Sequence, residues 1–381
     1  MSAVLDLLTE LVRADTVASG EGALAVRCAE LLRDNGFEVS VPGWEQGREQ
    51  LIARVGSDAA PLTLTGHLDT VPAEPGQWAS DPWAAERDGD RVVGRGTSDM
   101  KSGVAAVLIA AVDHTVRPHN CRGLQVVLTA GEETGCTGAV RLQRSALAPG
   151  GPLLVAEPTA NRLVPGHKGA HWIRLTAHGR AAHGSAPHLG DNAVVRLARA
   201  AAALHDHDGW PHHAIFGPMT ANVGMLRGGI QPNVVPDFAE LLLDVRTVPA
   251  VDGDDVRATV AQLAGDGVRV EDHVVLPVVD TQLDDPFVGI VRDALVAAGQ
   301  DGEPQPPARF FTDASVLARL LSPTENGAPV PTVVLGPGEP DQCHVVDEWC
   351  SAAKVEAAVE IYRNLFDRWC HSDIPRGDGS A

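Results

Sequence analysis

The chain has 381 residues, of which 44% are hydrophobic and 21% charged, a composition typical of a globular protein large enough for two domains. Its formal net charge of −20 argues against binding to nucleic acid or to an anionic membrane, because both carry negative charge. The opening residues, MSAVLDLLTELVRADT, predict an acidic amphipathic helix rather than a signal peptide, and no apolar run is long enough to span a membrane. The six cysteines form no CxxC pair, so we interpret them as free thiols in a reducing cytoplasm.

Strands and helices alternate over the first part of the chain, which predicts an α/β fold. Helices are expected near 2–14, 20–35 and 101–113, and strands near 37–42, 50–55, 62–66, 123–130 and 152–156. This alternation is typical of a mostly parallel sheet covered by helices, in which ligands bind beyond the carboxyl ends of the strands. The segment 71–97 is rich in proline, glycine and tryptophan, and it predicts a loop with short strands.

The pattern changes near residue 170. A strand with the alternating sequence HWIRLTAH is followed by a helix near 191–206, strands near 219–227 and 237–247, a helix near 253–264 and a strand near 267–276. This β-α-β-β-α-β order predicts a ferredoxin-like, split βαβ domain. We therefore expect residues 170–280 to form an inserted lid or dimerisation domain, and residues 1–169 plus 281–381 to form the catalytic domain. The final part predicts helices near 286–299, 313–321 and 347–369, and a strand near 330–335.

Several metal-binding residue types follow predicted strands or enter predicted helices. His67 comes directly after the apolar run 62–66, and Asp69 is placed to accept the other ring N–H of His67. An isolated H-x-D pair is usually a surface feature, and GEETG alone fits an acidic turn equally well. The other candidate ligands in such positions are Asp99, Glu132, Glu133, Glu157 and His344.

A cluster of this composition predicts a two-metal site. Converging carboxylates would repel one another, whereas two divalent cations would cancel their charge. Two histidines with several carboxylates suit zinc, with cobalt or manganese as substitutes. Asp99 is the candidate to bridge two ions, which in two-metal hydrolases lie about 3.5–4 Å apart.

The motifs that carry these residues resemble those of the M20 metallopeptidase family, over nearly the whole chain. They are GHLDTVP at 66–72, GRGTSDMKSG at 94–103, GEETG at 131–135, AEPT at 156–159, AHGSAP at 182–187 and CHVVDE at 343–348. The resemblance implies that His67, Asp99 and Glu157 hold one metal, and that Asp99, Glu133 and His344 hold the other. It further implies that Glu132 is the general base, that Asp69 orients His67, and that a cis peptide bond follows Asp99.

The resemblance also gives roles to residues of the inserted domain. Taken alone, His183 fits a solvated surface histidine, Arg246 a strand-end arginine, and Asn233 a turn before Pro236. The family implies instead that His183 polarises the substrate carbonyl, that Arg246 binds the substrate carboxylate, and that Asn233 contacts substrate. It implies a homodimer formed through the inserted domain, in which His183 of one chain serves the site of the other.

The implied activity is amide hydrolysis by a co-catalytic dizinc enzyme that removes an N-acyl group from an amino acid. The motifs at 157–159, 167–169 and 336–348 are most similar to the acetylornithine deacetylase branch. A succinyl-diaminopimelate desuccinylase is the nearest alternative, followed by a dipeptidase or carboxypeptidase, including release of an amino acid from a carrier-protein glutamate. A catalytically dead binding or scaffold protein is the non-enzyme alternative. The expected partners are a small N-acyl amino acid or short peptide, with neither nucleic acid nor membrane, in the cytoplasm.

Overall fold

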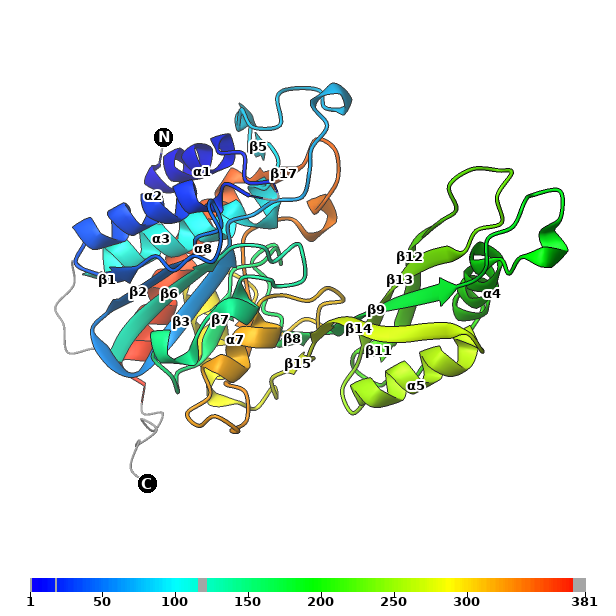
Figure 1. Ribbon diagram of the computed structural model, residues 1–381. Coiled ribbons are helices and arrows are strands. Elements are labelled where there is room, and N and C mark those ends of the chain that lie inside the picture. The colour runs from blue at the N-terminus through cyan, green and yellow to red at the C-terminus, as the bar shows by residue number, and fades with distance from the viewer. Residues whose placement is uncertain (1, 18, 116–121, 373–381) are drawn as a thin grey trace. The chain divides into compact units, whose positions relative to one another are not determined.

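The computed structural model describes residues 2–17, 19–115 and 122–372, and the chain divides into two compact units (Figure 1). The first comprises the chain up to Gly166, Asp280–Pro306, and the chain from Thr312 onward. The second comprises His167–Val279 and Pro307–Phe311. The segment 307–311 was expected in the first unit. It belongs to the second because it pairs with the start of that unit, where the Lys168 N–H donates to the Ala308 carbonyl oxygen at 2.9 Å.

A six-stranded sheet forms the centre of the first unit. Its strands in spatial order are β1 (Glu38–Ser40), β2 (Leu51–Val55), β6 (Arg122–Thr129), β3 (Ser57–His67), β7 (Leu153–Val155) and β16 (Thr332–Val334). Strand β3 pairs in parallel with both β6 and β7, and β7 pairs in parallel with β16, whereas β1 and β2 complete the sheet in antiparallel fashion. The predicted mostly parallel α/β sheet is confirmed.

Helices cover this sheet. They are α1 (Ala3–Arg13), α2 (Glu21–Asp34), α3 (Ser102–Thr115), α6 (Pro286–Ala297), α7 (Ala314–Leu320) and α8 (Ala352–Cys370). Helix α3, which reads SGVAAVLIAAVDHT, is buried along nearly all its length because it packs between α1, α8 and β3. Its apolar side chains join those of α1, α2, α6 and α8 in one continuous core over the sheet. Helix α7 packs against β7.

The C-terminal helix begins later than its sequence predicts. A helix was expected from residue 347, but residues 349–351 form strand β17 (Trp349–Ser351), which pairs with β5 (Arg91–Val93) and so joins β4 (Glu86–Asp88) in a small sheet. Helix α8 starts at Ala352, where the Ser351 side chain accepts a hydrogen bond from the Lys354 N–H. Pairing with a distant strand overrides the local helical pattern here.

The second unit has the predicted ferredoxin-like order. Its elements are β9 (Gly169–His178), α4 (Ala193–His205), β12 (Thr220–Gly228), β13 (Phe238–Thr247), α5 (Gly253–Ala264) and β14 (Val268–Leu276). The antiparallel sheet has the spatial order β12-β13-β9-β14, so β12 and β14 are its edges. Alternate residues of β9 and β13 pack against α4 and α5, which explains the alternating sequence. A short hairpin joins β10 (His212–His213) to β11 (Gly217–Pro218). The chain passes from one unit to the other within β8 (Gly166–His167) and β15 (Val279–Asp280), and again on either side of residues 307–311.

The cysteines differ from expectation at one position. Cys28, Cys136, Cys343 and Cys350 are free thiols, as predicted. Cys370, the last residue of α8, is disulfide-bonded, so the expectation of a free thiol is wrong there. Cys121 lies outside the described residues. Among the helices that the structure describes, none combines the length and apolar character needed to cross a membrane.

Candidate metal centre

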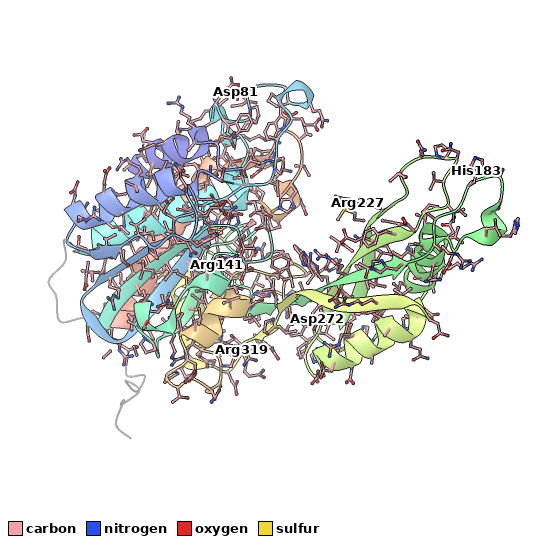
Figure 2. All side chains as sticks on the ribbon, in the orientation of Figure 1. Asp81, Arg141, His183, Arg227, Asp272 and Arg319 are labelled. Atoms are coloured by element: carbon pink, nitrogen blue, oxygen red, sulfur yellow. The ribbon has the colours of Figure 1, made fainter. Side chains whose placement is uncertain are left out.

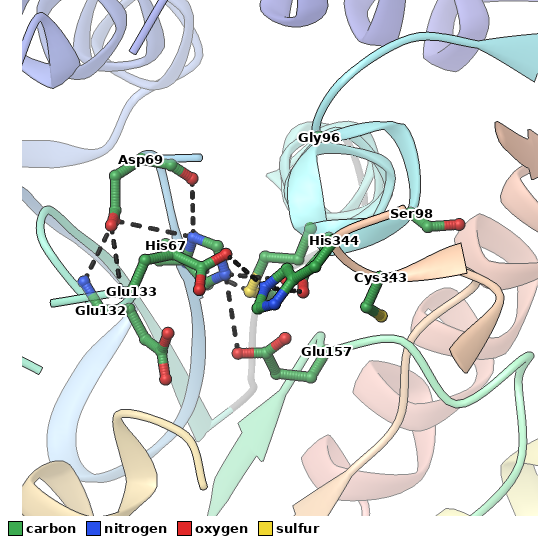
Figure 3. A network of polar contacts seen from close by, with 12 residues as sticks. His67, Asp69, Gly96, Ser98, Glu132, Glu133, Glu157, Cys343 and His344 are labelled. Atoms are coloured by element: carbon green, nitrogen blue, oxygen red, sulfur yellow. Dashed lines mark hydrogen bonds and ion pairs between the residues drawn. The ribbon is translucent and has the colours of Figure 1, made fainter. Parts of the chain in front are cut away.

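The parallel strands bring the predicted ligands to one edge of the sheet (Figure 3). His67 ends β3, Glu132 and Glu133 follow β6, and Glu157 follows β7, so all lie beyond the carboxyl ends of neighbouring parallel strands. The turn after β6 begins at Gly131, whose φ of +73° suits glycine, and a Cβ there would meet the Thr137 hydroxyl at 2.2 Å. Chain direction and turn geometry thus assemble ligands from separate strands.

Asp99 lies between the two histidines of the site. One carboxylate oxygen, Oδ1, is 3.1 Å from the His67 Nε2, and the other, Oδ2, is 3.3 Å from the His344 Nε2. Glu157 lies on the His67 side, with Oε1 at 3.8 Å from Nε2 of that ring. Glu133 lies on the His344 side, with Oε1 at 3.0 Å from Nε2. The five side chains form two groups that share one carboxylate.

The donor atoms are close enough together for metal binding. Among the described residues, the ligand atoms of His67, Asp99 and Glu133 lie within 4.8 Å of one another, and so do those of His67, Glu132 and Glu157. Imidazole nitrogen and carboxylate oxygen are the ligands expected for zinc and related divalent ions. The residues present therefore fit a metal centre, and the Glu132 carboxylate is one of the groups that lie within this distance.

The ionisation of these groups has the pattern expected of an assembled cation site. Burial raises the pKa of Glu132 and that of Glu157, and neighbouring charges add to or offset this effect. Hydrogen bonds to Asp99 and Glu133 raise the pKa of His344 to about 10. Burial lowers the pKa of His67, but its hydrogen bond to Asp99 and nearby carboxylates reverse that shift. A divalent cation beside these buried carboxylates would favour their ionised forms and offset their mutual repulsion.

Asp69 contacts His67 differently from the sequence prediction. Its backbone carbonyl oxygen, at 2.9 Å, is the partner of the His67 Nδ1, whereas its carboxylate oxygen Oδ1 is 3.6 Å away. The carboxylate instead accepts hydrogen bonds from the backbone N–H groups of Glu132 and Glu133, both at 3.1 Å. Asp69 therefore orients the imidazole through its main chain and holds the Glu132–Glu133 turn through its side chain (Figure 3).

Glu348, within the motif CHVVDE, supports the site, a role that its sequence does not predict. Its fully buried carboxylate accepts hydrogen bonds from the N–H groups of Gly96 (3.0 Å), Ser98 (2.8 Å) and Asp99 (3.0 Å). It also pairs with the Arg95 guanidinium at 2.6 Å. These contacts fix the segment that presents Asp99, in which the Asp99–Met100 peptide bond is cis, as predicted. The feature of the sequence that could have indicated this role is the position of Glu348, an acidic residue four positions after the candidate ligand His344.

Three predicted site residues belong to the second unit. His183 lies on a loop, forms a β-bridge with Val234, and contacts the Ser185 hydroxyl through Nδ1 at 2.7 Å. The neighbouring N–H of Gly184 donates to the Asn233 carbonyl oxygen at 2.7 Å, so the His183 and Asn233 loops are adjacent. Figure 2 labels His183 on this exposed loop.

Arg246, near the end of β13, is held by its own unit. Its Nε donates to both carboxylate oxygens of Asp244 at 3.0 Å, and its guanidinium lies 4.9 Å from the centre of the Phe311 ring. Asp244 uses only the Nε donor of Arg246, whereas an arginine carries five N–H donors. The two terminal guanidinium nitrogens are therefore available to a further partner. The roles of His183, Asn233 and Arg246 in substrate binding remain predictions.

Comparison with known proteins identifies the family. Residues 63–368 match peptidase family M20/M25/M40. The chain is 30% identical to the acetylornithine deacetylase of Vibrio atlanticus (strain LGP32) over 96% of this chain and 98% of that protein. Its fold resembles an M20 family metallo-carboxypeptidase from Sulfolobus solfataricus, with a TM-score of 0.77 and 19% identity over 97% of this chain and 99% of that one. It also resembles the di-peptidase Dug1p from Saccharomyces cerevisiae, with a TM-score of 0.77 and 14% identity over 97% and 96% of the two chains.

The chain therefore belongs to the M20 peptidase family, a metal-dependent family, and it is a hydrolase of amide bonds. The family resemblance and the predicted class of enzyme are confirmed.

Proposed function

We propose that this protein is a co-catalytic dizinc amidohydrolase that releases an amino acid from its N-acyl group. The observation that supports this proposal best is the placement of the Asp99 carboxylate, whose two oxygens face the rings of two different histidines. A carboxylate in that position suits a bridge between two cations. The 30% identity to an acetylornithine deacetylase over nearly the full length of both chains supports the deacylase activity.

His67, Asp99 and Glu157 would hold one ion, and Asp99, Glu133 and His344 would hold the other. The contacts of Glu157 with His67, and of Glu133 with His344, support this division. Zinc fits the mixed imidazole and carboxylate set, and cobalt or manganese would also suit it. When bound, such ions supply Lewis acidity and lower the pKa of water.

The reaction itself depends on Glu132. Its carboxylate is buried, and the Asp69 carboxylate fixes its backbone. Glu132 takes a proton from the attacking water as the water oxygen bonds to the carbonyl carbon of the amide. It then gives that proton to the amine nitrogen as the carbon–nitrogen bond breaks. Glu132 thus acts first as a general base and then as a general acid.

Substrate recognition would involve the second unit. Arg246 would bind the carboxylate of the substrate with its free guanidinium edge, since Asp244 occupies only Nε. Asn233 and His183, on adjacent loops, would contact the substrate amide, with His183 polarising its carbonyl oxygen. A succinyl-diaminopimelate desuccinylase is the nearest alternative, and fold similarity to a di-peptidase and a metallo-carboxypeptidase keeps a peptidase as the next.

We further propose a homodimer formed through the second unit, with His183 acting in the site of the partner subunit. Strand β12 is an edge of its sheet, and unpaired edges are usually covered by another chain or element. Large apolar side chains are exposed beside this edge, including Leu226 (41%), Ile230 (86%) and Phe238 (45%). We also propose a cytoplasmic location, which the free thiols of Cys28, Cys136, Cys343 and Cys350 support and the disulfide at Cys370 does not.

The proposal is tested by hydrolysis assays on the zinc-loaded protein. We expect release of the free amino acid from N-acetyl-ornithine, with less or none from N-succinyl-diaminopimelate, N-acetyl-methionine and dipeptides. The Glu132→Gln variant serves as a control for contaminating activity. Faster hydrolysis of a dipeptide would favour the peptidase alternative, and no hydrolysis of any of these amides would favour the binding-protein alternative.

A further inference from the structure

The short segment 307–311 brings Phe311 to the second unit. The residues on both sides of this segment belong to the first unit. The segment is attached through Ala308, which forms a parallel β-bridge with His167 and accepts a hydrogen bond from the Lys168 N–H at 2.9 Å. These are backbone contacts, and ordering the segment costs conformational entropy. The contacts of the Phe311 side chain show what the second unit gains from it.

Phe311 packs on one face of the antiparallel sheet. The guanidinium carbon of Arg246 lies over its ring, 4.9 Å from the ring centre, and the Trp172 ring meets it edge-to-face at 5.9 Å and 74°. In the pairing of β13 with β9, Asp244 lies opposite Trp172, and Arg246 follows two residues later on the same face. The intervening Val245 belongs to the core formed with α4 and α5, so Arg246 lies on the face away from these helices.

The Arg246 guanidinium is held on two sides. Asp244 accepts from its Nε with both carboxylate oxygens at 3.0 Å, and the Phe311 ring covers one of its faces. The Arg246 side chain is still 25% exposed, so a small ligand can reach it. A flexible side chain loses rotamer entropy when it binds a ligand, and a side chain that is already fixed loses less. Holding the guanidinium in place therefore strengthens the binding of a carboxylate to its terminal nitrogens.

Asp244 alone would not hold the guanidinium in this orientation. A rotation of the guanidinium would let Asp244 accept from a terminal nitrogen instead of Nε, and the fork needed for bidentate binding of a ligand carboxylate would be lost. Such a rotation would also break the stacking of Arg246 on Phe311, because arginine stacks on an aromatic ring through its planar face. The ring thus favours the orientation in which Asp244 takes Nε alone.

We propose that Phe311 is a positioning residue for Arg246 and sets the preference for a substrate with a free carboxylate, an inference that rests on the proposed function. The Phe311 ring, which packs against Trp172, keeps the terminal nitrogens of Arg246 directed to one carboxylate of the substrate. The preferred substrate class is then an N-acyl amino acid with a free carboxylate. An analogue whose carboxylate is replaced by a neutral amide loses this contact.

The first test compares N-acetyl-ornithine with its carboxamide as substrates of the zinc-loaded protein. We expect Phe311→Leu to raise KM for N-acetyl-ornithine about tenfold, the effect of losing a partly buried cation–π contact, with kcat within about twofold. KM for the carboxamide should not change. Phe311→Tyr, which keeps an aromatic ring, should retain the wild-type KM, and Trp172→Leu should raise it about threefold. The matched control is Phe310→Leu, in the same segment, which should leave KM unchanged.

The second test does not depend on turnover. In a nitrogen-15 NMR spectrum of the full chain carrying Glu132→Gln, the Arg246 Nε–H signal is assigned by its absence in Arg246→Lys. Phe311→Leu should shift this signal, because the guanidinium loses the neighbouring ring. Titration with N-acetyl-ornithine should move the signal, with a Kd about tenfold higher in Phe311→Leu. The carboxamide should leave the signal in place.

Three results would overturn the inference: an unchanged KM in Phe311→Leu, an equal rise in KM for the carboxamide, or an Arg246 signal that Phe311→Leu does not shift. If the wild type hydrolyses none of the amides, the proposed function fails instead. The NMR titration would then still decide whether Phe311 positions Arg246 for a carboxylate.

Discussion

Replacing Glu348 by alanine is expected to destabilise the first unit more than the replacement of any exposed residue by alanine. The carboxylate accepts three backbone N–H groups, from Gly96, Ser98 and Asp99, and it neutralises the buried Arg95 guanidinium. Arg95 and Glu348 have side-chain exposures of only 5% and 0%, so water cannot replace the lost partner without local unfolding.

Breaking such a buried pair by removing one partner typically costs about 3–5 kcal/mol. Glu348→Ala also leaves three backbone N–H groups without an acceptor, and each unsatisfied buried donor costs about 1–3 kcal/mol. We therefore expect the loss of unfolding free energy to lie at the upper end of that range. In Glu348→Gln, the amide oxygen can still accept from Ser98 and Asp99, so a smaller loss of about 2–3 kcal/mol is expected. The control is Glu10→Ala, which breaks an exposed pair with Arg27 and should cost at most about 1 kcal/mol.

Urea unfolding followed by tryptophan fluorescence measures these free energies. Trp78 is a suitable reporter, because the Arg95 guanidinium lies 5.1 Å from the centre of its ring. If Glu348→Ala unfolds within about 1 kcal/mol of Glu10→Ala, the carboxylate does not hold the Asp99 segment and the reasoning is wrong.

Three further predictions concern the metal centre and the dimer. Glu132→Gln should keep its metals but lose about 10²–10⁴-fold in kcat, and near-normal turnover would contradict its role as general base. Elemental analysis after dialysis against zinc should approach two ions per chain, since His67, Asp99 and Glu157 would hold one ion and Asp99, Glu133 and His344 the other. Saturation at one ion would leave that second set without a function. Mixing His183→Ala with Glu132→Ala chains should restore activity toward half the wild-type value per mixed dimer, because one site then contains both groups. A lack of recovery would place His183 in its own chain's site.

Local patterns predicted much of the fold because the signals are contained within each element. The alternation in β9 and the apolar run of β3 located both strands to within a few residues, apart from the early start of β3 at Ser57. The order of elements in the second unit followed directly, and parallel strand ends predicted where His67, Glu133 and Glu157 would meet.

What the sequence did not reveal depends on contacts between distant segments. Residues 349–351 were predicted to be helical because the strand they pair with, β5, lies more than two hundred positions earlier in the chain. Asp69 was assigned a side-chain contact with His67, but only the folded turn shows that its carboxylate faces Glu132 instead. Glu348 received no role for the same reason, since its partners are backbone N–H groups and the Arg95 side chain, which tertiary structure brings to it.

The insertion of the second unit has a consequence during synthesis. His67, Asp99, Glu133 and Glu157 all precede the insertion, whereas His344 follows it. A ribosome must add residues 158–343 after Glu157 before His344 exists, which takes roughly 10–40 s at about 5–20 residues per second. During that interval the nascent chain contains all three acidic ligands of the proposed site but neither His344 nor Glu348, which fixes the Asp99 segment. Metal loading is therefore expected to be a late event, reached only when the C-terminal part of the chain has docked.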